Sequence, residues 1–105
     1  MRILFDQGTP APLRDHLSAH SVETAYEKGW SALRNGELLV NAEAEFDLLI
    51  TTDRNLRHQQ NLAARRFAII VLPTTSWPRL QRMTQEIVNA VDSLKPGEYL
   101  ELPLS

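Results

Sequence analysis

The chain has 105 residues, of which 43% are hydrophobic and 23% charged, the usual proportions for a single globular domain spanning residues 1–105. No apolar run approaches the roughly 20 residues of a membrane span, and the absence of cysteine excludes a disulfide scaffold and a cysteine-ligated zinc site. The net charge of −2 excludes a globally basic nucleic-acid binder, so a polyanionic partner would need a local basic patch. The start of the chain lacks a signal-peptide pattern, and we expect a cytoplasmic protein.

The first part of the chain alternates strand-like runs with a helical segment. Residues 2–5 (RILF) form a short apolar run that ends at Asp6, and a turn containing glycine and proline follows. We expect a helix next, with Leu13 and Leu17 on its inner face. The stretch 21–26 then alternates weakly in polarity, which predicts a second short strand.

The middle of the chain predicts a second helix and a third strand. Asn35 is an acceptable N-cap for a helix over about 36–45, and Glu37 lies in its first turn, where a carboxylate suits the helix dipole. The apolar run 48–50 predicts a strand buried on both faces, and it is followed by two threonines and Asp53. The inward face of the helix is expected to contain Leu38, Leu39, Ala42 and Phe46.

The last part of the chain begins with a polar helical connection over 54–66 that contains arginines and no acidic residue. Residues 67–72 (FAIIVL) predict another buried strand, and alternation over 98–102 predicts an edge strand. The last helix begins near Trp77 and has the clearest amphipathic pattern. Its apolar positions are Leu80, Met83, Ile87, Val91 and Leu94.

This alternation of strands and helices predicts a three-layer α/β/α sandwich with a mostly parallel sheet of about five strands. Right-handed crossovers would place the carboxyl ends of all strands at one edge of the sheet, where ligands bind in open α/β sheets. Asp6 and Asp53 each follow a strand, and Glu37 reaches the same edge because helices that follow parallel strands begin there. The three carboxylates therefore form one candidate site.

Three clustered carboxylates repel one another unless protons or a cation lie between them. All-oxygen ligation suits Mg²⁺ or Mn²⁺, and such an ion polarises a phosphodiester and activates water. We therefore expect Asp6, Glu37 and Asp53 to be catalytic metal ligands, with carboxyl groups within about 8 Å of one another. The alternative is structural, with the two aspartates as caps and the glutamate as a dipole partner.

Basic and aromatic residues add candidates for contact with nucleic acid. The arginines of the 54–66 connection form either a solvated helix face or a surface that contacts phosphate. Trp30 and Trp77 are expected to be partly buried loop anchors, although either ring could stack a base. The three histidines show no ligand spacing, and we expect them at the surface. The predicted nucleic-acid contacts are Arg54, Arg57, Arg65 and Arg66.

Three stretches, ILFDQGTP, RNGELL and LLITTDRNL, occur in this order along the chain. They resemble the motifs of PIN-like domains, in particular of a short subgroup grouped with VapC-type toxins. That subgroup has a strand ending in Asp-Glu-Asn, an acidic helix start, and a strand ending in Thr-x-Asp-x-Asp. The resemblance covers most of the chain and implies an α/β/α fold and metal-dependent cleavage of RNA. It matches Asp6, Glu37 and Asp53 to the acidic residues of the family.

The chain departs from the family pattern at three positions where many members have a carboxylate. Gln7, Asn35 and Asn55 stand there, and their amide oxygens would ligate a hard cation with less charge. We therefore expect Mg²⁺ or Mn²⁺ to bind weakly, if it binds. Thr74 is a further auxiliary candidate. Together with Thr75 and Ser76, it either caps the last helix, the favoured interpretation, or contacts a phosphate or metal-bound water.

The leading functional hypothesis is a metal-dependent ribonuclease, the toxin of a toxin–antitoxin pair, with RNA as substrate and a small antitoxin-like protein as partner by analogy. The alternative is a degenerate PIN-like module that binds RNA or a protein without catalysis, which the three amides favour. A homodimer is compatible with both hypotheses, and neither requires a membrane. A phospho-receiver fits less well, because Gln7 replaces a second acid and Lys95 precedes the last strand.

Overall fold

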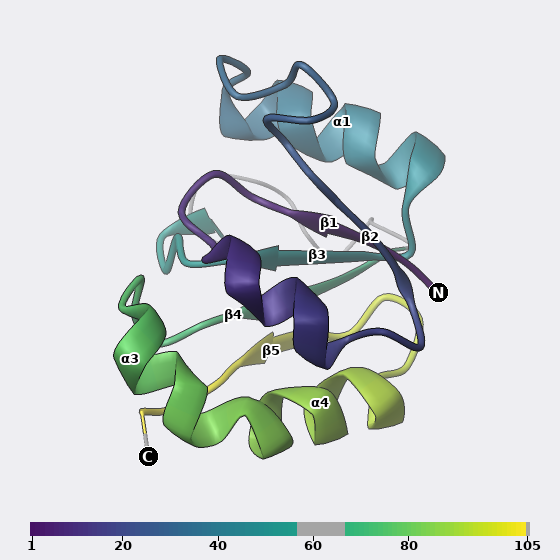
Figure 1. Ribbon diagram of the computed structural model, residues 1–105. Helices are drawn as coiled ribbons and strands as arrows, with labels where there is room; N and C mark the ends of the chain where they lie inside the picture. The colour runs from purple at the N-terminus through teal and green to yellow at the C-terminus, as the bar shows by residue number, and fades with distance from the viewer. Residues whose placement is uncertain (57–66, 105) are drawn as a thin grey trace.

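The computed structural model describes residues 1–56 and 67–104, with every side chain among them except that of Asn35. In these residues, five strands form one parallel sheet in the order β2-β1-β3-β4-β5 (Figure 1). This confirms the predicted α/β fold with a parallel sheet. The elements, with η for 3₁₀ helices, are β1 (Arg2–Phe5), η1 (Ala11–His16), β2 (Ser21–Thr24), α1 (Asn35–Glu45), β3 (Leu48–Thr51), β4 (Ala68–Val71), α3 (Trp77–Leu80), η3 (Gln81–Met83), α4 (Thr84–Ser93) and β5 (Tyr99–Glu101).

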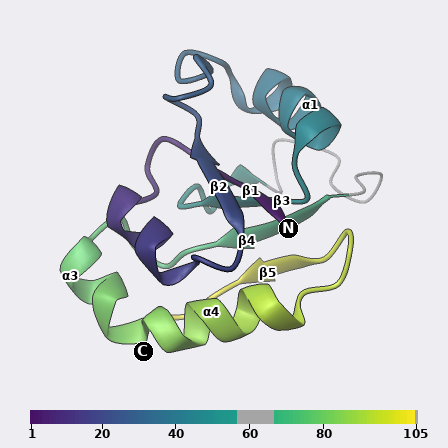
Figure 2. The same cartoon turned by 45° about the vertical axis from the view of Figure 1, so that its right-hand side comes forward.

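Two hydrophobic cores lie on opposite faces of the sheet. The helical segments η1, α3 and α4 cover one face of the sheet, and α1 covers the other (Figure 2). Ile3 and Phe5 of β1 belong to the core of the first face, whereas Leu4 belongs to that of the second. Every residue of β3 and β4 is buried, because helical layers cover both faces of these central strands. This explains why both strands are continuous apolar runs in the sequence.

The segment after β1 is shorter and tighter than the predicted helix. It forms the six-residue 3₁₀ helix η1, in which Pro12 cannot donate a backbone hydrogen bond. The turn closes with an i→i+3 bond of 3.0 Å from the N–H of Leu17 to the carbonyl of Arg14. Leu13 and Leu17 are nevertheless both buried, as predicted.

The helix α1 begins one position before the predicted start. Arg34 has the extended backbone of an N-cap, so Asn35 is the first helical residue and is not the cap. The cap position makes no side-chain hydrogen bond to the helix. The predicted inward face is confirmed, because its four members are all buried: Leu38, Leu39, Ala42 and Phe46.

The last predicted helix is divided into α3, η3 and α4. Residues three apart eclipse one another in a 3₁₀ turn, so Leu80 and Met83 stay buried on one side through the irregular part. Ile87 and Val91 then continue the same buried face along α4. Within residues 1–56 and 67–104, no helix is both long enough and apolar enough to cross a membrane.

Candidate functional site

The carboxyl ends of β1 and β3 meet at the centre of one sheet edge. The strand order reverses direction between these two strands, and ligands of doubly wound sheets bind outside such a switch point. Asp6 directly follows β1, and Asp53 follows β3 after one intervening residue. Two of the three predicted acids therefore lie at the switch point, and both are partly exposed.

Thr51 links these two acids. Its side chain is fully buried at the end of β3. Its hydroxyl donates a hydrogen bond of 2.7 Å to Oδ2 of Asp6 and accepts one of 3.1 Å from the backbone N–H of Asp53. One hydroxyl thus orients the first carboxylate and the backbone that carries the second. Thr51 was not among the predicted site residues, although its place two residues before Asp53 is a signal for such a role.

Both carboxylates also accept a hydrogen bond from the backbone just after them. The backbone N–H of Gln7 donates to Oδ1 of Asp6 at 2.7 Å, and that of Asn55 donates to Oδ1 of Asp53 at 2.9 Å. The structural role considered for the two aspartates is therefore present. A carboxylate offers about four lone-pair sites, so these bonds are compatible with a further ligand.

The loop after β1 packs closely on the loops after β3 and β4. A Cβ atom added to Gly8 would stand 2.4 Å from Oγ1 of Thr52 and 3.7 Å from Cγ2 of Thr75. Thr9 is buried, and its hydroxyl donates to a backbone carbonyl of β3 at 2.8 Å. The three loops therefore hold one another in place around Asp6.

Thr74 and Arg54 lie at the same edge. The hydroxyl of Thr74 accepts a hydrogen bond of 3.1 Å from the N–H of Ser76, and Ser76 is the N-cap residue of α3. Of the three residues considered as caps, Ser76 is at the cap position without a side-chain hydrogen bond to the helix, and Thr74 closes the turn before it. The exposed Arg54 reaches across to the β4–α3 loop, where Nη2 donates to the carbonyl of Pro73 at 3.3 Å.

The third predicted acid, Glu37, is exposed in the first turn of α1. Across the two described ranges, no group of three or more Asp, Glu or His side chains is arranged to hold a metal ion. Asp6, Glu37 and Asp53 thus form no three-carboxylate centre by themselves, and their role as metal ligands remains a prediction. Four further predicted site residues lie outside what the structure describes. They are the auxiliary ligand Asn35, whose side chain is not described, and the predicted nucleic-acid contacts Arg57, Arg65 and Arg66.

Comparison of the chain with protein-family models, curated proteins and solved structures gives no match. The resemblance to PIN-like domains therefore rests on the three sequence motifs. To these the structure adds an α/β fold with a parallel sheet of five strands within the described residues.

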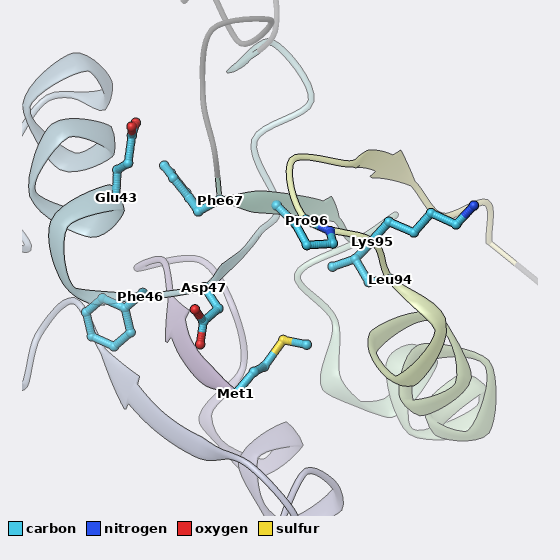
Figure 3. Close-up of a pocket in the computed structure, with 9 residues that line it drawn as sticks. Met1, Glu43, Phe46, Asp47, Phe67, Leu94, Lys95 and Pro96 are labelled. Atoms are coloured by element: carbon cyan, nitrogen blue, oxygen red, sulfur yellow. The ribbon is translucent and has the colours of Figure 1, made fainter.

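A cavity of about 330 Å³ lies at the opposite, amino edge of the sheet (Figure 3). Its lining includes Met1 before β1, Asp47 before β3, Phe67 before β4 and Lys95 before β5. Lys95 is therefore at the other edge from Asp53, which counts against a phospho-receiver. The cavity is not part of the candidate site.

The two tryptophans are partly buried, as predicted, and lie in different surroundings. Trp30 packs edge-on against Phe46, with ring centroids 6.1 Å apart, and the amine of Lys28 lies 5.0 Å from the Trp30 centroid. Trp77 opens α3 after β4, and its ring centroid is 5.7 Å from that of His16. Only Trp77 follows a strand end next to the candidate site.

The histidines are only partly at the surface. His16 is exposed, as predicted, and His58 lies outside the described residues. The side chain of His20 is 14% exposed, with Nε2 3.3 Å from Oδ1 of Asp92 and Nδ1 3.2 Å from the amino group of Met1. His20 is therefore half-buried at the surface, because contacts with α4 and with the start of the chain cover part of its ring.

Glu27, in the turn after β2, has a structural role. Arg14 pairs with it through Nη2–Oε1 at 2.6 Å and Nη1–Oε2 at 3.2 Å, and the N–H of Thr24 donates to Oε1 at 2.9 Å. The hydrogen bond from Arg14, followed by that from Thr24, lowers the pKa of Glu27 below its ordinary value of 4.5. This carboxylate ties η1 to the end of β2.

Proposed function

We propose that the protein is a cytoplasmic PIN-like ribonuclease that holds Mg²⁺ or Mn²⁺ at the carboxyl edge through Asp6 and Asp53. The carrying observation is that these acids follow neighbouring strands at the switch point and are linked by the hydroxyl of Thr51. Magnesium is usually bound by one or two carboxylates together with substrate phosphates, rather than by an all-protein cage. Two partly exposed carboxylates fit such a site, which the RNA phosphate would complete.

The residues around this pair have distinct roles in the proposal. The bound ion would supply Lewis-acid polarisation of the phosphodiester and an activated water. Thr51 holds the Asp6 carboxylate in one orientation, and Arg54 presents an exposed guanidinium beside the same edge. Glu37 is the third ligand that the motifs imply, and the amides of Gln7 and Asn55 are auxiliary oxygen donors.

The test is cleavage of a fluorescent single-stranded RNA in Mn²⁺ and in EDTA. We expect cleavage only with metal, and a loss of more than roughly a hundredfold in Asp6→Asn and in Asp53→Asn, since even outer-shell changes cost 10–100-fold. The matched control is Asp47→Asn, the same substitution at the amino edge, which should retain full activity. Equal loss in all three variants, or no cleavage by the wild type, would end the nuclease proposal.

Metal affinity gives a second measurement on the same site. Asn55→Asp adds a carboxylate two residues from Asp53, and charge count tunes the affinity for hard cations. Mn²⁺ should therefore raise the melting temperature of Asn55→Asp at lower concentrations than it does for the wild type, since stabilisation grows logarithmically with the ratio of concentration to Kd. A response from the variant alone would favour a non-catalytic natural protein.

A second candidate function is RNA or protein binding without catalysis. The observation that favours it is the lack of a three-carboxylate group in the described part of the chain, where both oxygens of Asp6 already accept hydrogen bonds. RNA binding without cleavage would support this candidate. The toxin role and its antitoxin-like partner follow from the resemblance alone. Growth arrest when the protein is expressed, relieved by co-expression of a small protein encoded next to it, would support that role.

A further inference from the structure

The start of α3 forms a surface next to the candidate site that the carboxylates do not use. Thr75 lies 3.7 Å from the Cβ position of Gly8, so the β4–α3 loop touches the loop that carries Asp6. Trp77 follows two residues later. An aromatic ring is therefore carried next to the switch point by the backbone of a well-packed loop.

The ring of Trp77 is only partly buried in the core. It packs against the core beneath η1, α3 and α4, yet it remains partly exposed. Its neighbour His16 is exposed, and the two rings are tilted by 46° with centroids 5.7 Å apart. Trp30, in contrast, lies between Phe46 and the amine of Lys28. Of the two tryptophans, Trp77 is the one that follows the loop packed against Gly8, near Asp6.

Three exposed arginines lie in the segments next to Trp77. Arg79 of α3 and Arg82 of η3 are exposed, and Arg54 donates to the carbonyl of Pro73 four residues before Trp77. Within the described residues, none of these three guanidinium groups lies within ion-pair distance of a carboxylate. The segments on either side of Trp77 thus carry positive charge in a chain whose net charge is −2.

We propose that Trp77 is a stacking platform for a base of single-stranded RNA, with Arg54, Arg79 and Arg82 contacting the adjacent phosphates. Any base can stack on an aromatic ring, and cations beside it neutralise the backbone, so this combination binds single strands with little sequence preference. The inference rests on the proposed function, because it extends the RNA path from the scissile phosphate at Asp6 and Asp53 onto α3.

The test measures binding in EDTA, so that it does not depend on metal or cleavage. In a Trp30→Phe background, Trp77 is the sole tryptophan, and a ten-nucleotide polyuridine RNA should quench its fluorescence. With labelled RNA, Trp77→Leu should weaken binding roughly tenfold, since base–aromatic stacking contributes about 1–3 kcal/mol. Melting curves would show whether the variant remains folded.

Charge reversal supplies a test that leaves the ring in place. Arg79→Glu should weaken binding and reduce the salt dependence, by about 0.7 in the logarithmic slope for each lost phosphate contact. The matched control is Lys95→Glu, which makes the same change in net charge at the exposed amino edge and should have little effect. If Trp77→Leu does not fold, the difference in RNA binding between Arg79→Glu and Lys95→Glu decides whether this surface binds RNA.

The outcomes separate this inference from the proposed function. Cleavage by the wild type without quenching of Trp77, and with equal effects of Arg79→Glu and Lys95→Glu, would overturn the stacking surface and leave the nuclease intact. Quenching that depends on Arg79, without cleavage in any metal, would support the surface and overturn the nuclease. Absence of both binding and cleavage would overturn both.

Discussion

The two edges of the sheet both place aspartates at strand ends, but they use them differently. At the amino edge, Asp47 accepts a 2.8 Å hydrogen bond from the N–H of Arg2, and its own N–H donates to the carbonyl of Arg2 at 2.8 Å. These two bonds continue the hydrogen bonding between β1 and β3 by one more pair, in which the side chain of Asp47 serves as one acceptor. At the carboxyl edge, Asp6 and Asp53 follow the same two strands, and the buried hydroxyl of Thr51 lies between them.

The surroundings of the acids explain the difference. The amino edge contains a cavity lined largely by apolar groups, among them Met1, Phe67 and Pro96. The described residues at the carboxyl edge include several threonines, among them Thr52 and Thr74. Hydroxyls next to paired carboxylates suit water, phosphate or a hydrated cation, whereas an apolar wall does not. An aspartate at a strand end is thus a site candidate only when its neighbours are polar and a second acid accompanies it.

The largest effect on stability is expected from Thr51→Val, which removes the hydroxyl between the two acids while keeping the shape of the side chain. The N–H of Asp53 loses its acceptor, and an unsatisfied group of this kind costs about 2 kcal/mol. Thr51→Ser is the control, because it retains the hydroxyl and loses only a methyl group. Urea denaturation would measure both. Equal stability of wild type and Thr51→Val would contradict the hydroxyl bridge.

Gly8→Ala should have the next largest effect, again confined to the carboxyl edge. The new Cβ would meet Oγ1 of Thr52 at 2.4 Å, and relieving that overlap should cost about 1.5 kcal/mol, a usual value for overpacking. The double variant Gly8→Ala/Thr52→Ala removes the clashing hydroxyl and should recover most of the loss. Additive losses in this cycle would show that the two residues are not in contact.

Asp47→Ala tests the purely structural use of an aspartate at the amino edge. The N–H of Arg2 loses its acceptor, at a cost of about 1 kcal/mol, typical for one hydrogen bond. Asp47→Asn keeps an oxygen acceptor and should be nearly neutral. Asp6→Asn should also leave the fold intact, because its amide still offers one oxygen as an acceptor to the donors that now bond the carboxylate. Thermal melting in EDTA would compare the stabilities of Asp47→Ala, Asp47→Asn and Asp6→Asn. A large loss in Asp6→Asn would make that acid structural like Asp47.

The sequence predicted the fold more fully than the site, for physical reasons. Apolar runs bounded by turn residues identify buried strands, and both β3 and β4 are buried throughout. The division of the last helix was missed because the spacing of Leu80 and Met83 suits both α and 3₁₀ turns. Asp6 and Asp53 were located by the rule that ligands bind beyond the carboxyl ends of parallel strands. The role of Thr51 depends on the register that pairs Phe5 with Ile50, which no single stretch of sequence encodes.

The smallest effect concerns Glu27, a structural carboxylate in the turn after β2. Arg14 and the N–H of Thr24 lower its pKa below 4.5, so its contribution to stability is present in full above that pH and is lost as the pH falls through the folded-state pKa. Glu27→Gln should therefore melt slightly below the wild type at pH 7, and the difference should vanish toward pH 3. Arg14→Gln should remove most of this pH dependence, because the strongest donor to the carboxylate is gone and only that of Thr24 is left. A difference that stays constant from pH 7 to pH 3 would show that the ion pair does not stabilise this turn, and that Glu27 is as free to change as the exposed Glu37.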